Sequence, residues 1–490
     1  MKKNLWFDTM LPIALCFMLQ LAFFSLSVFK ESGEAYTAIF LTQLFVSIIL
    51  FAAAGAIHCS LSIAFCSSIL VAAGGFTQTA ISSTHEGFED GSQTFMMHML
   101  VGTMAFLAVI LFMNCGRNKI LKIFYVDKGL NLLTAAGIVC YLAAIAGNRI
   151  AGAANWIFIE GLSIQVTELA KLIYFWILGV CANSMGEREI RRIIVLYLIQ
   201  AFFLLIASEF GFLILITVTT AIVLMISVRE WAVFVSGLRK YICLIAAAMA
   251  GIAVFGILKR EIFVRSLEKV VLRFSLMINP EADPYGLGYQ MIQGEKAILR
   301  GGLWGTGLET YVPVLDSDMV FVIMIELFGV VLAAAILTLF WHLCTKAAKD
   351  SFMRGSALGI TLAVSMLVQA LYNAAAAAGL LPLSGMTMPF ISMGGTSYII
   401  SMILLAIIFS TAGESYKYAD AEENRKEERK NEDRKVIFDD KDVHLYSHRS
   451  RHNFDDENWC VRSTATGTGR KKNRSNRRSE KSENPFWDNL

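Results

Sequence analysis

The sequence predicts an all-α, polytopic membrane protein, and three observations lead to this class. Hydrophobic residues make up 56% of the 490 residues, whereas charged residues make up only 17%. The mean hydropathy of +0.57 is not that of a soluble chain of this length. Apolar stretches long enough to cross a bilayer recur along the sequence. The net charge of +3 is too small to indicate a nucleic-acid-binding protein.

Twelve apolar stretches of about 17 to 25 residues are predicted to be transmembrane helices. They lie near residues 10–28, 37–57, 61–81, 95–114, 129–147, 164–183, 193–207, 211–228, 241–258, 319–343, 355–378 and 394–412. The first lacks the small-residue cleavage site of a signal peptide, so we interpret it as a helix of the mature protein. Only the polar residues SEFG separate the seventh and eighth, which predicts a tight helical hairpin.

The distribution of basic residues predicts the orientation of these helices. Lys and Arg cluster at Lys2 and Lys3, then in alternate connections near residues 117–128, 188–192, 229–240 and 346–354. The intervening stretch STHEGFEDGSQT has acidic residues but no Lys or Arg. Because cytoplasmic loops carry the excess of basic residues, both termini are predicted to be cytoplasmic.

One long connection, residues 259–318, departs from this pattern because it is predicted to be external and yet has seven basic residues. These are Lys259, Arg260, Arg265, Lys269, Arg273, Lys296 and Arg300. Long translocated loops escape the charge rule, so the topology stands. Loops of this length in a compact protein are usually functional.

The composition changes at about residue 414, where dense mixed charge replaces the apolar pattern. Residues 414–490 have too few apolar side chains to form a core, so we predict a disordered, charged cytoplasmic tail. Its basic block could contact anionic lipids or a partner, or the tail could simply be solvated. The nine cysteines show no metal-binding spacing and are predicted to be reduced.

The stretch YVPVLDSDMVF, residues 311–321, places Asp316 and Asp318 directly before an apolar run. A carboxylate beside hydrocarbon is costly unless it is paired or faces a wet cavity. The simple alternative is that both residues mark the start of a transmembrane helix, where the helix dipole favours Asp.

Three further sites combine polar chemistry with membrane depth. Glu168 and Lys171 share one helix face within an apolar run, either lining a cavity or holding helix register as a neutralised pair. Glu209 in SEFG is either a functional carboxylate at the tip of the predicted hairpin or simply the end of a helix. The stretch GLLPLSGMTMPFISMGGTS, residues 379–397, is an external loop or an irregular segment that returns into the protein.

At these motifs the sequence resembles the SEDS family (shape, elongation, division and sporulation) of bacterial cell-wall synthesis, which includes FtsW, RodA and SpoVE. Five motifs follow the order of the family across residues 147–400. They are RIAGAANWIFIEGLSIQVTELAK, SEFG, GYQMIQGEKAILRGGLWGTGL, YVPVLDSDMVF and GLLPLSGMTMPFISMGGTS. The family has three helices before these motifs and this chain has five. The resemblance therefore implies an additional two-helix segment at 1–57, a ten-helix SEDS membrane domain at 58–413 and the tail at 414–490.

The resemblance implies a peptidoglycan glycosyltransferase of the bacterial cytoplasmic membrane. Such an enzyme polymerises lipid II, an undecaprenyl-pyrophosphate-linked disaccharide-pentapeptide, on the outer face during division, elongation or sporulation. The resemblance also implies a class B penicillin-binding protein transpeptidase as partner. Two functions of other classes stay open: a transporter that flips lipid II, and a non-catalytic division scaffold.

The resemblance assigns the family's essential acidic position to Asp318. An inverting single displacement needs a base for the acceptor hydroxyl, and Asp318 is the predicted general base. The predicted substrate-binding residues are Glu168, Lys171, Arg273, Lys296, Arg300 and Asp316, and those predicted to shape the cavity are Trp156, Gly394 and Gly395. Of the substrate-binding residues, Arg273, Lys296 and Arg300 are the candidates to stabilise the departing pyrophosphate.

Asp316 stands where the family has His. Two nearby carboxylates raise one pKa by repulsion, or they hold a divalent cation between them; no cofactor is otherwise expected.

Overall fold

The computed structural model describes residues 12–21, 33–85, 87–114, 123–146, 148–150, 153–159, 162–207, 209–228 and 260–413, and four isolated positions between 235 and 246. The chain divides into two units, Met1–Glu427 and Glu428–Leu490, and every described residue belongs to the first. The predicted tail at 414–490 lies outside the described residues.

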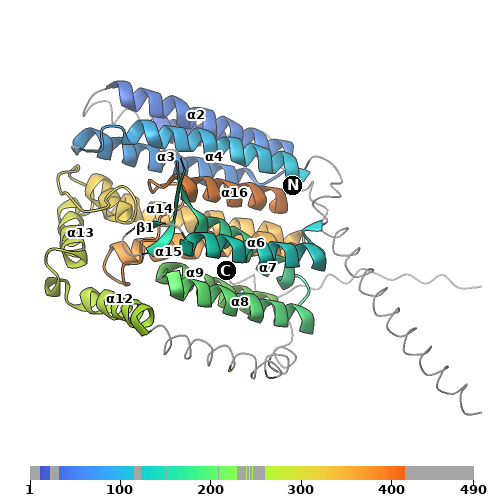
Figure 1. The fold of residues 1–490 in the computed structure, drawn as a ribbon. Helices are drawn as coiled ribbons and strands as arrows, with labels where there is room; N and C mark the ends of the chain where they lie inside the picture. Colours follow the sequence, from blue (N-terminus) through green and yellow to red (C-terminus); the bar gives the residue numbers. More distant parts are fainter. Residues whose placement is uncertain are drawn as a thin grey trace, which may run out of the picture. The chain divides into compact units, whose positions relative to one another are not determined.

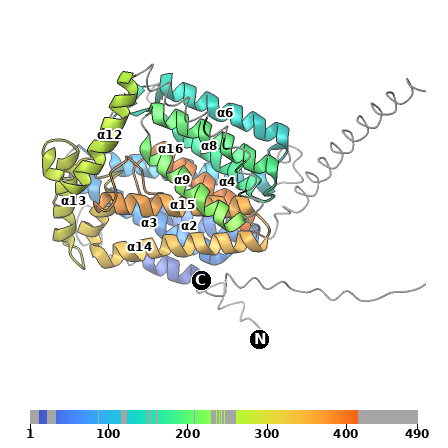
Figure 2. The same cartoon turned by 90° about the horizontal axis from the view of Figure 1, so that it is seen from below.

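Long apolar helices dominate the described part of the chain (Figures 1 and 2). Nine of them are long and apolar enough to cross a membrane: α2 (Gly33–Ala56), α3 (Leu61–Thr84), α4 (Gly91–Asn114), α6 (Asp127–Ala146), α8 (Glu187–Ala207), α9 (Phe210–Ser227), α14 (Val320–Met353), α15 (Ala357–Ala377) and α16 (Gly395–Ala412). Two shorter helices, α7 (Val166–Ala182) and Pro12–Leu21, also coincide with predicted spans. Eleven of the twelve predicted stretches therefore contain a helix, and the twelfth, 241–258, lies almost wholly outside the described residues.

The helices lie side by side, and the most buried ones form the centre of the bundle. Helix α14 packs on α15 and α3, α16 packs on α4, and α7 packs on α6 and α15. Buried residues lie on almost every face of α3 and α16, because neighbouring helices surround both. This confirms a polytopic helical membrane protein.

A small antiparallel sheet, which the hydropathy pattern did not predict, lies between α6 and α7. Strands β1 (Asn148–Ile150), β2 (Ala153–Ile159) and β3 (Leu162–Gln165) pair in chain order. The β-branched and aromatic residues of NWIFI and LSI favour strands. These strands are too short to stand out as membrane-length apolar stretches, so the purely helical prediction missed them.

The connection predicted as a 60-residue loop contains two helices. These are α12 (Arg260–Ile278) and α13 (Leu287–Gly301), with the short 3₁₀ helix η1 (Pro280–Ala282) between them. Both lie at the end of the bundle at which α14 begins, which we call the Asp318 end (Figure 2). Their apolar residues alternate with charged ones at helical spacing, so neither helix forms a continuous apolar stretch.

Candidate active site

The turn that carries Asp318, residues 313–319, is held through its backbone by three other segments. The carbonyl oxygens of residues 316–318 each accept a hydrogen bond from a buried side chain. Gln78 of α3 donates to the first at 2.7 Å, Ser392 to the second at 2.6 Å and Asn373 of α15 to the third at 3.0 Å. Because the donors come from separate parts of the chain, the turn has a defined position before α14 begins.

Asp318 is a half-buried residue whose carboxyl group has the ionisation behaviour of a base near neutral pH. Burial raises its pKa from 3.8 to about 6, Asp316 adds to this rise and Arg273 opposes it. The backbone at Gly385 leaves room beside the carboxylate, since a Cβ there would lie 3.6 Å from Oδ2 of Asp318. Gly385 has a φ of +77°, a conformation that favours glycine.

Asp316 contributes the predicted repulsion, although burial is the larger cause of the raised pKa at Asp318. Burial also raises the pKa of Asp316 itself. Among the described residues, no group of three or more His, Cys, Asp and Glu side chains is suited to hold a metal ion. Asp316 and Asp318 would have to bind a cation with few further ligands, so the metal alternative stays a prediction.

Glu168 and Lys171 form an ion pair in the first turns of α7, with the two charged atoms 2.5 Å apart and both side chains almost fully buried. Lys171 also donates to Oε1 of Gln369 in α15 at 3.0 Å, and Nε2 of Gln369 donates to the carbonyl of Thr387 at 3.0 Å. A polar chain therefore runs from α7 through α15 to the segment at 379–394.

The segment 379–394 packs into the protein instead of forming a simple loop. Leu383, Met386, Met388, Phe390 and Ile391 are buried. Its carbonyl groups accept hydrogen bonds from polar side chains of α3 and α15. Irregular backbone at this depth is tolerated where such partners satisfy it.

The cavity residues predicted from the motifs lie at the start of α16 and in the sheet. Gly395 faces His98 of α4 so closely that a Cβ would lie 2.8 Å from Nε2, whereas a Cβ on Gly394 would have 3.6 Å of clearance. Trp156 lies in β2 opposite Gln165. The backbone N–H of Gln165 donates to Thr396 at 3.2 Å, so the sheet is joined to α16.

Arg273 lies at a narrow apolar cleft of about 200 Å³. The cleft is lined by Phe210, Leu213, Ile214, Val270, Arg273, Phe274, Tyr372, Pro382, Leu383 and Ser384. Burial lowers the pKa of Arg273, and the charges of Glu209 and Asp318 oppose this effect. The cleft thus combines apolar walls with one cation that is electrostatically coupled to Asp318.

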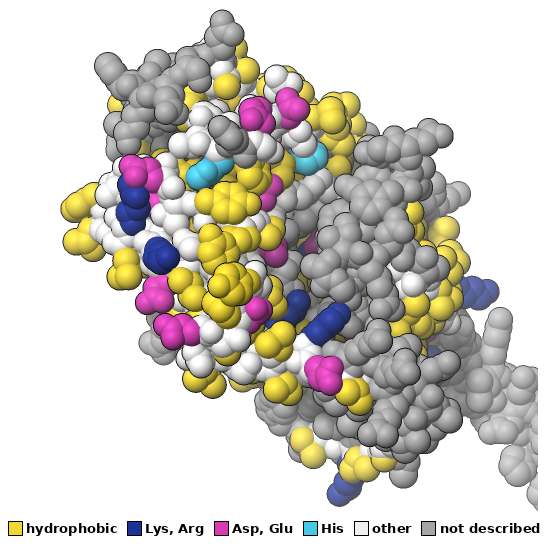
Figure 3. Space-filling model, turned by 60° about the vertical axis from the view of Figure 1, so that its left-hand side comes forward, with side chains coloured by type: hydrophobic (Ala, Val, Ile, Leu, Met, Phe, Trp, Pro, Cys, Tyr) yellow, Lys and Arg dark blue, Asp and Glu magenta, His cyan; other side chains and the backbone are white. Residues whose placement is uncertain are grey.

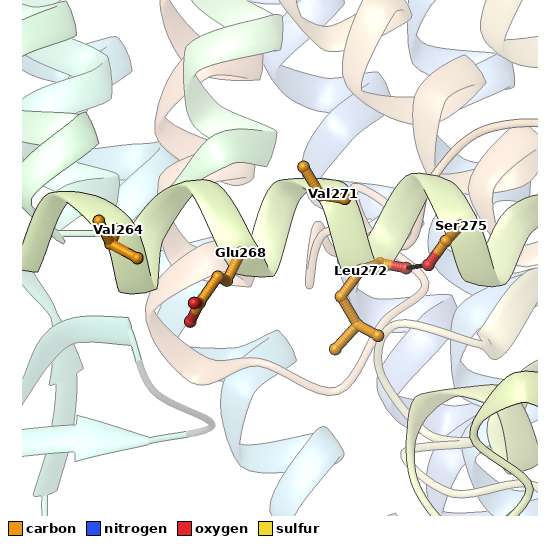
Figure 4. A pocket seen from close by; sticks show the side chains of 5 residues that line it. All are labelled: Val264, Glu268, Val271, Leu272 and Ser275. Atoms are coloured by element: carbon orange, nitrogen blue, oxygen red, sulfur yellow. Dashed lines mark hydrogen bonds between the residues drawn. The ribbon is translucent and has the colours of Figure 1, made fainter.

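A larger hollow of about 400 Å³ follows another part of α12 and is almost wholly apolar. Figure 4 shows its lining, in which Glu268 is the one charged side chain among Val264, Val271, Leu272 and Ser275. Among the described residues, its lining does not bring together the several polar groups that would orient a sugar, so we do not assign the chemistry to it.

The other predicted phosphate-binding residues, Lys296 and Arg300, lie on the exposed part of α13. Neither contributes to the shifted pKa of Asp318. Arg300 forms ion pairs with Glu309 and Glu326. Figure 3 brings the α12–α13 side forward and shows acidic and basic side chains mixed on that face, so it is not uniformly basic.

Four polar residues of the site were not predicted from the sequence: Gln78, Gln369, Asn373 and Ser392. Each is buried and supports either the Asp318 turn or the segment 379–394. The signal was present, since Gln369 and Asn373 are four residues apart in an apolar helix and therefore share one face. Both are uncharged amides, whereas the predicted site residues of the membrane zone were chosen for their charge.

Comparison with known proteins agrees with this architecture. A family model described as a cell cycle protein, FTSW_RODA_SPOVE, matches residues 60–417. The chain is 29% identical over 352 residues to a probable peptidoglycan glycosyltransferase FtsW of Aliivibrio salmonicida, covering 68% of this chain and 83% of that protein. It is 28% identical to the protein of the same description from Enterococcus hirae, covering 57% and 72% respectively.

A solved structure has the same fold. One chain of a peptidoglycan synthase complex, described in terms of structural coordination of polymerization and crosslinking, superposes with a TM-score of 0.55 at 19% identity. The match covers 73% of this chain and 99% of that chain. With the helical membrane fold, the order of the motifs and a family model that spans most of the sequence, the chain belongs to the FtsW/RodA/SpoVE family of cell cycle proteins.

Proposed function

We propose that the protein is a peptidoglycan glycosyltransferase that polymerises lipid II, with Asp318 as the general base. The observation that carries this proposal is a carboxylate with a pKa of about 6, on a turn fixed through three consecutive carbonyls and electrostatically coupled to Arg273, which lines an apolar cleft. Relatives of the chain are named as probable enzymes of this class.

In the proposed reaction Asp318 takes the proton of the acceptor sugar hydroxyl as its oxygen attacks the anomeric carbon of the donor. The bond from that carbon to the pyrophosphate oxygen breaks, and the undecaprenyl pyrophosphate leaves with the electron pair. Attack from the opposite face converts the α-linked donor into a β-1,4-linked strand. Asp318 is ionised at neutral pH, because its pKa of about 6 lies below 7.

Arg273 is the residue we assign to the departing pyrophosphate. A guanidinium binds phosphate oxygens through two parallel hydrogen bonds and stabilises charge that develops on the leaving group. The apolar walls of its cleft suit the first part of the lipid chain. Lys171 and Glu168 line the site and hold the segment at 379–394 through Gln369.

We further propose that the Asp318 end faces outward and that both termini are cytoplasmic, as the distribution of basic residues predicts. Segment 1–57 is then an addition to the family domain, which agrees with a family match that begins at residue 60. The partner in this proposal is a class B penicillin-binding protein, and the similarity to a chain of a synthase complex supports it.

The test is to incubate purified protein in detergent with labelled lipid II, with and without its transpeptidase, and to separate the products by size. A polymerase converts lipid II into long glycan strands that a muramidase digests. Detergent removes the two compartments that a flippase needs, so polymer formation distinguishes the two activities. Absence of polymer under both conditions would rule out the proposed function.

A further inference from the structure

The segment 301–308, GGLWGTGL, has no part in the proposed chemistry, yet its backbone is pressed against α14. A Cβ added at Gly301 would lie 2.2 Å from the carbonyl oxygen of Ile325, and one at Gly305 would lie 2.4 Å from that of Leu327. Only glycine fits such an approach. The close contact between this segment and α14 therefore depends on glycine at both positions.

This segment fills a break in α14. Gly329 has a φ of 87° and a ψ of 163°, which interrupts the helix. The N–H of Val330 donates to the carbonyl of Gly302 at 2.9 Å, and the N–H of Thr306 donates to the carbonyl of Glu326 at 3.0 Å. The segment thus satisfies backbone groups that the interrupted helix cannot pair internally.

The side chain of Glu326, on the turn of α14 before the break, is fully buried and accepts several hydrogen bonds at one oxygen. Its Oε1 receives the hydroxyl of Thr310 at 2.7 Å, the N–H of Thr310 at 3.0 Å and the N–H of Glu309 at 3.4 Å. Arg300 lies 3.5 Å from the same oxygen. These donors stabilise the charge of a buried carboxylate at Oε1, whereas Oε2 of Glu326 is buried with no hydrogen-bond partner among the described residues. We call Arg300, Thr310 and Glu326 the Glu326 clasp.

The clasp closes a stretch of chain whose midpoint is Asp318. Thr310 and Glu326 each lie eight residues from Asp318 in sequence, and their contact brings both ends of this stretch together. The carbonyls at 316–318 are held on the other side by Gln78, Ser392 and Asn373. The Glu326 clasp therefore holds the two ends of the stretch 310–326 together. The hydrogen bonds to the three carbonyls fix the position of the turn between those ends.

We propose that Glu326 is a positioning residue: by holding Thr310 against α14, it fixes the stretch that carries Asp318. The proposal rests on the general-base role proposed for Asp318. In this arrangement Arg300 serves the clasp and not a substrate phosphate. The effect is on orientation, so loss of the clasp lowers the rate of the chemical step and leaves the binding of lipid II unchanged.

The test uses substitutions at Thr310, which is partly exposed and can change without opening the core. Thr310→Val keeps the shape and removes the hydroxyl donor, whereas Thr310→Ser keeps the donor. Misplacement of a reacting group is costly, so we expect kcat to fall about tenfold or more in the Val variant, with KM within about twofold of the parent. The Ser variant should recover most of kcat.

Thr338→Val is the matched control, because it removes an exposed hydroxyl from α14, the helix that carries Glu326, where the hydroxyl donates only to the carbonyl of Ala334.

A second readout does not depend on activity. Hydrogen exchange of the amides at 311–319 should be at least about fivefold faster in Thr310→Val than in the parent, and close to the parent in Thr310→Ser. Unchanged exchange, unchanged kcat, or a rise in KM alone would overturn the positioning role. If the parent itself makes no polymer, the exchange result still decides the clasp, and the failure belongs to the proposed function.

Discussion

At the scale of single residues, the chemistry depends on how Asp318 is held and not on its type alone. A carboxylate at a helix start would ordinarily be ionised well below neutral pH. In this protein burial is the main cause that brings the pKa of Asp318 to about 6, with Asp316 adding to the rise. The sequence predicted the repulsion by Asp316 but not the burial, because burial comes from the packing of the segment 379–394 over the turn.

The pH dependence of polymerisation follows from this pKa. A base works only when it is ionised, so kcat/KM for lipid II should rise about tenfold per pH unit below 6 and level off above it. Arg273→Gln removes the charge that lowers the pKa of Asp318, so the inflection should move to higher pH. Lys349→Gln, on the exposed part of α14 remote from Asp318, is the control and should leave the inflection in place. Initial rates between pH 5 and 9 measure the inflection in the parent and in both variants. The same inflection in Arg273→Gln as in the parent would contradict the coupling between Arg273 and Asp318.

At the scale of elements, the buried ion pair in α7 fixes how that helix meets α15. Lys171→Met leaves Glu168 buried without its partner and breaks the contact to Gln369. Removing one member of a buried pair costs about 3 to 5 kcal/mol. We therefore expect a clear fall in the thermal unfolding temperature of the purified protein in detergent.

The double variant, Glu168→Gln with Lys171→Met, separates stability from activity. It leaves no uncompensated charge, so most of the lost thermal stability should return. Polymerisation should stay low, because the anchor to Gln369 and Thr387 is still missing. If Lys171→Met unfolds at the temperature of the parent, the ion pair does not stabilise the contact between α7 and α15.

The start of α16 offers a second test among the elements. A methyl group at Gly395 meets the ring of His98, so Gly395→Ala should displace the end of α16 or α4 and reduce the yield of folded protein severalfold. Gly55→Ala makes the same change in α2 at a position with nothing within 4 Å and should be tolerated. Size-exclusion chromatography of both variants measures the yield of folded protein. Equal yields would mean that the close contact between Gly395 and His98 does not limit folding.

The elements that the sequence predicted best are those with a single physical cause. Membrane-length apolar stretches identified eleven helices, since hydropathy alone specifies them. Helices α12 and α13 were missed because charged residues interrupt their apolar ones, and the strands β1, β2 and β3 were missed because each is too short to form a membrane-length apolar stretch. The break of α14 at Gly329 was also missed, since it depends on a segment more than twenty residues earlier in the chain.

At the scale of the whole molecule, the polar groups of the site converge from α3, α7, α12, α15 and the segment 379–394. The family motifs predicted Asp318, Glu168 and Lys171 as a group, and the structure connects them through Gln369 and Asn373. The sequence places those two amides on one face of an apolar helix, but the carbonyl groups that they bind are known only from the packed structure. For Arg300 the sequence suggested a role that its contacts do not support. Its charge predicted a phosphate-binding residue, whereas in the structure it forms an ion pair with Glu326.

The proposed orientation makes a prediction about the two ends of the molecule. In a background without native cysteines, Tyr285→Cys lies on a side chain that is 95% exposed between η1 and α13, and Met353→Cys lies at the far end of α14. An impermeant thiol reagent added to intact cells should label the first and not the second. After permeabilisation it should label both. The reverse pattern would invert the topology and place Asp318 on the wrong side for an external polymerase.

The central claim, that Asp318 is the base of a lipid II polymerase, is tested most directly by the rate of polymer formation with Asp318→Asn. Asn has nearly the same shape and cannot accept the proton, so the rate should fall by at least about 100-fold while the protein stays folded. Asp350→Asn makes the same change in the ion pair with Lys346 remote from the site and should polymerise at the rate of the parent within about twofold. Near-normal polymerisation by folded Asp318→Asn would contradict the account.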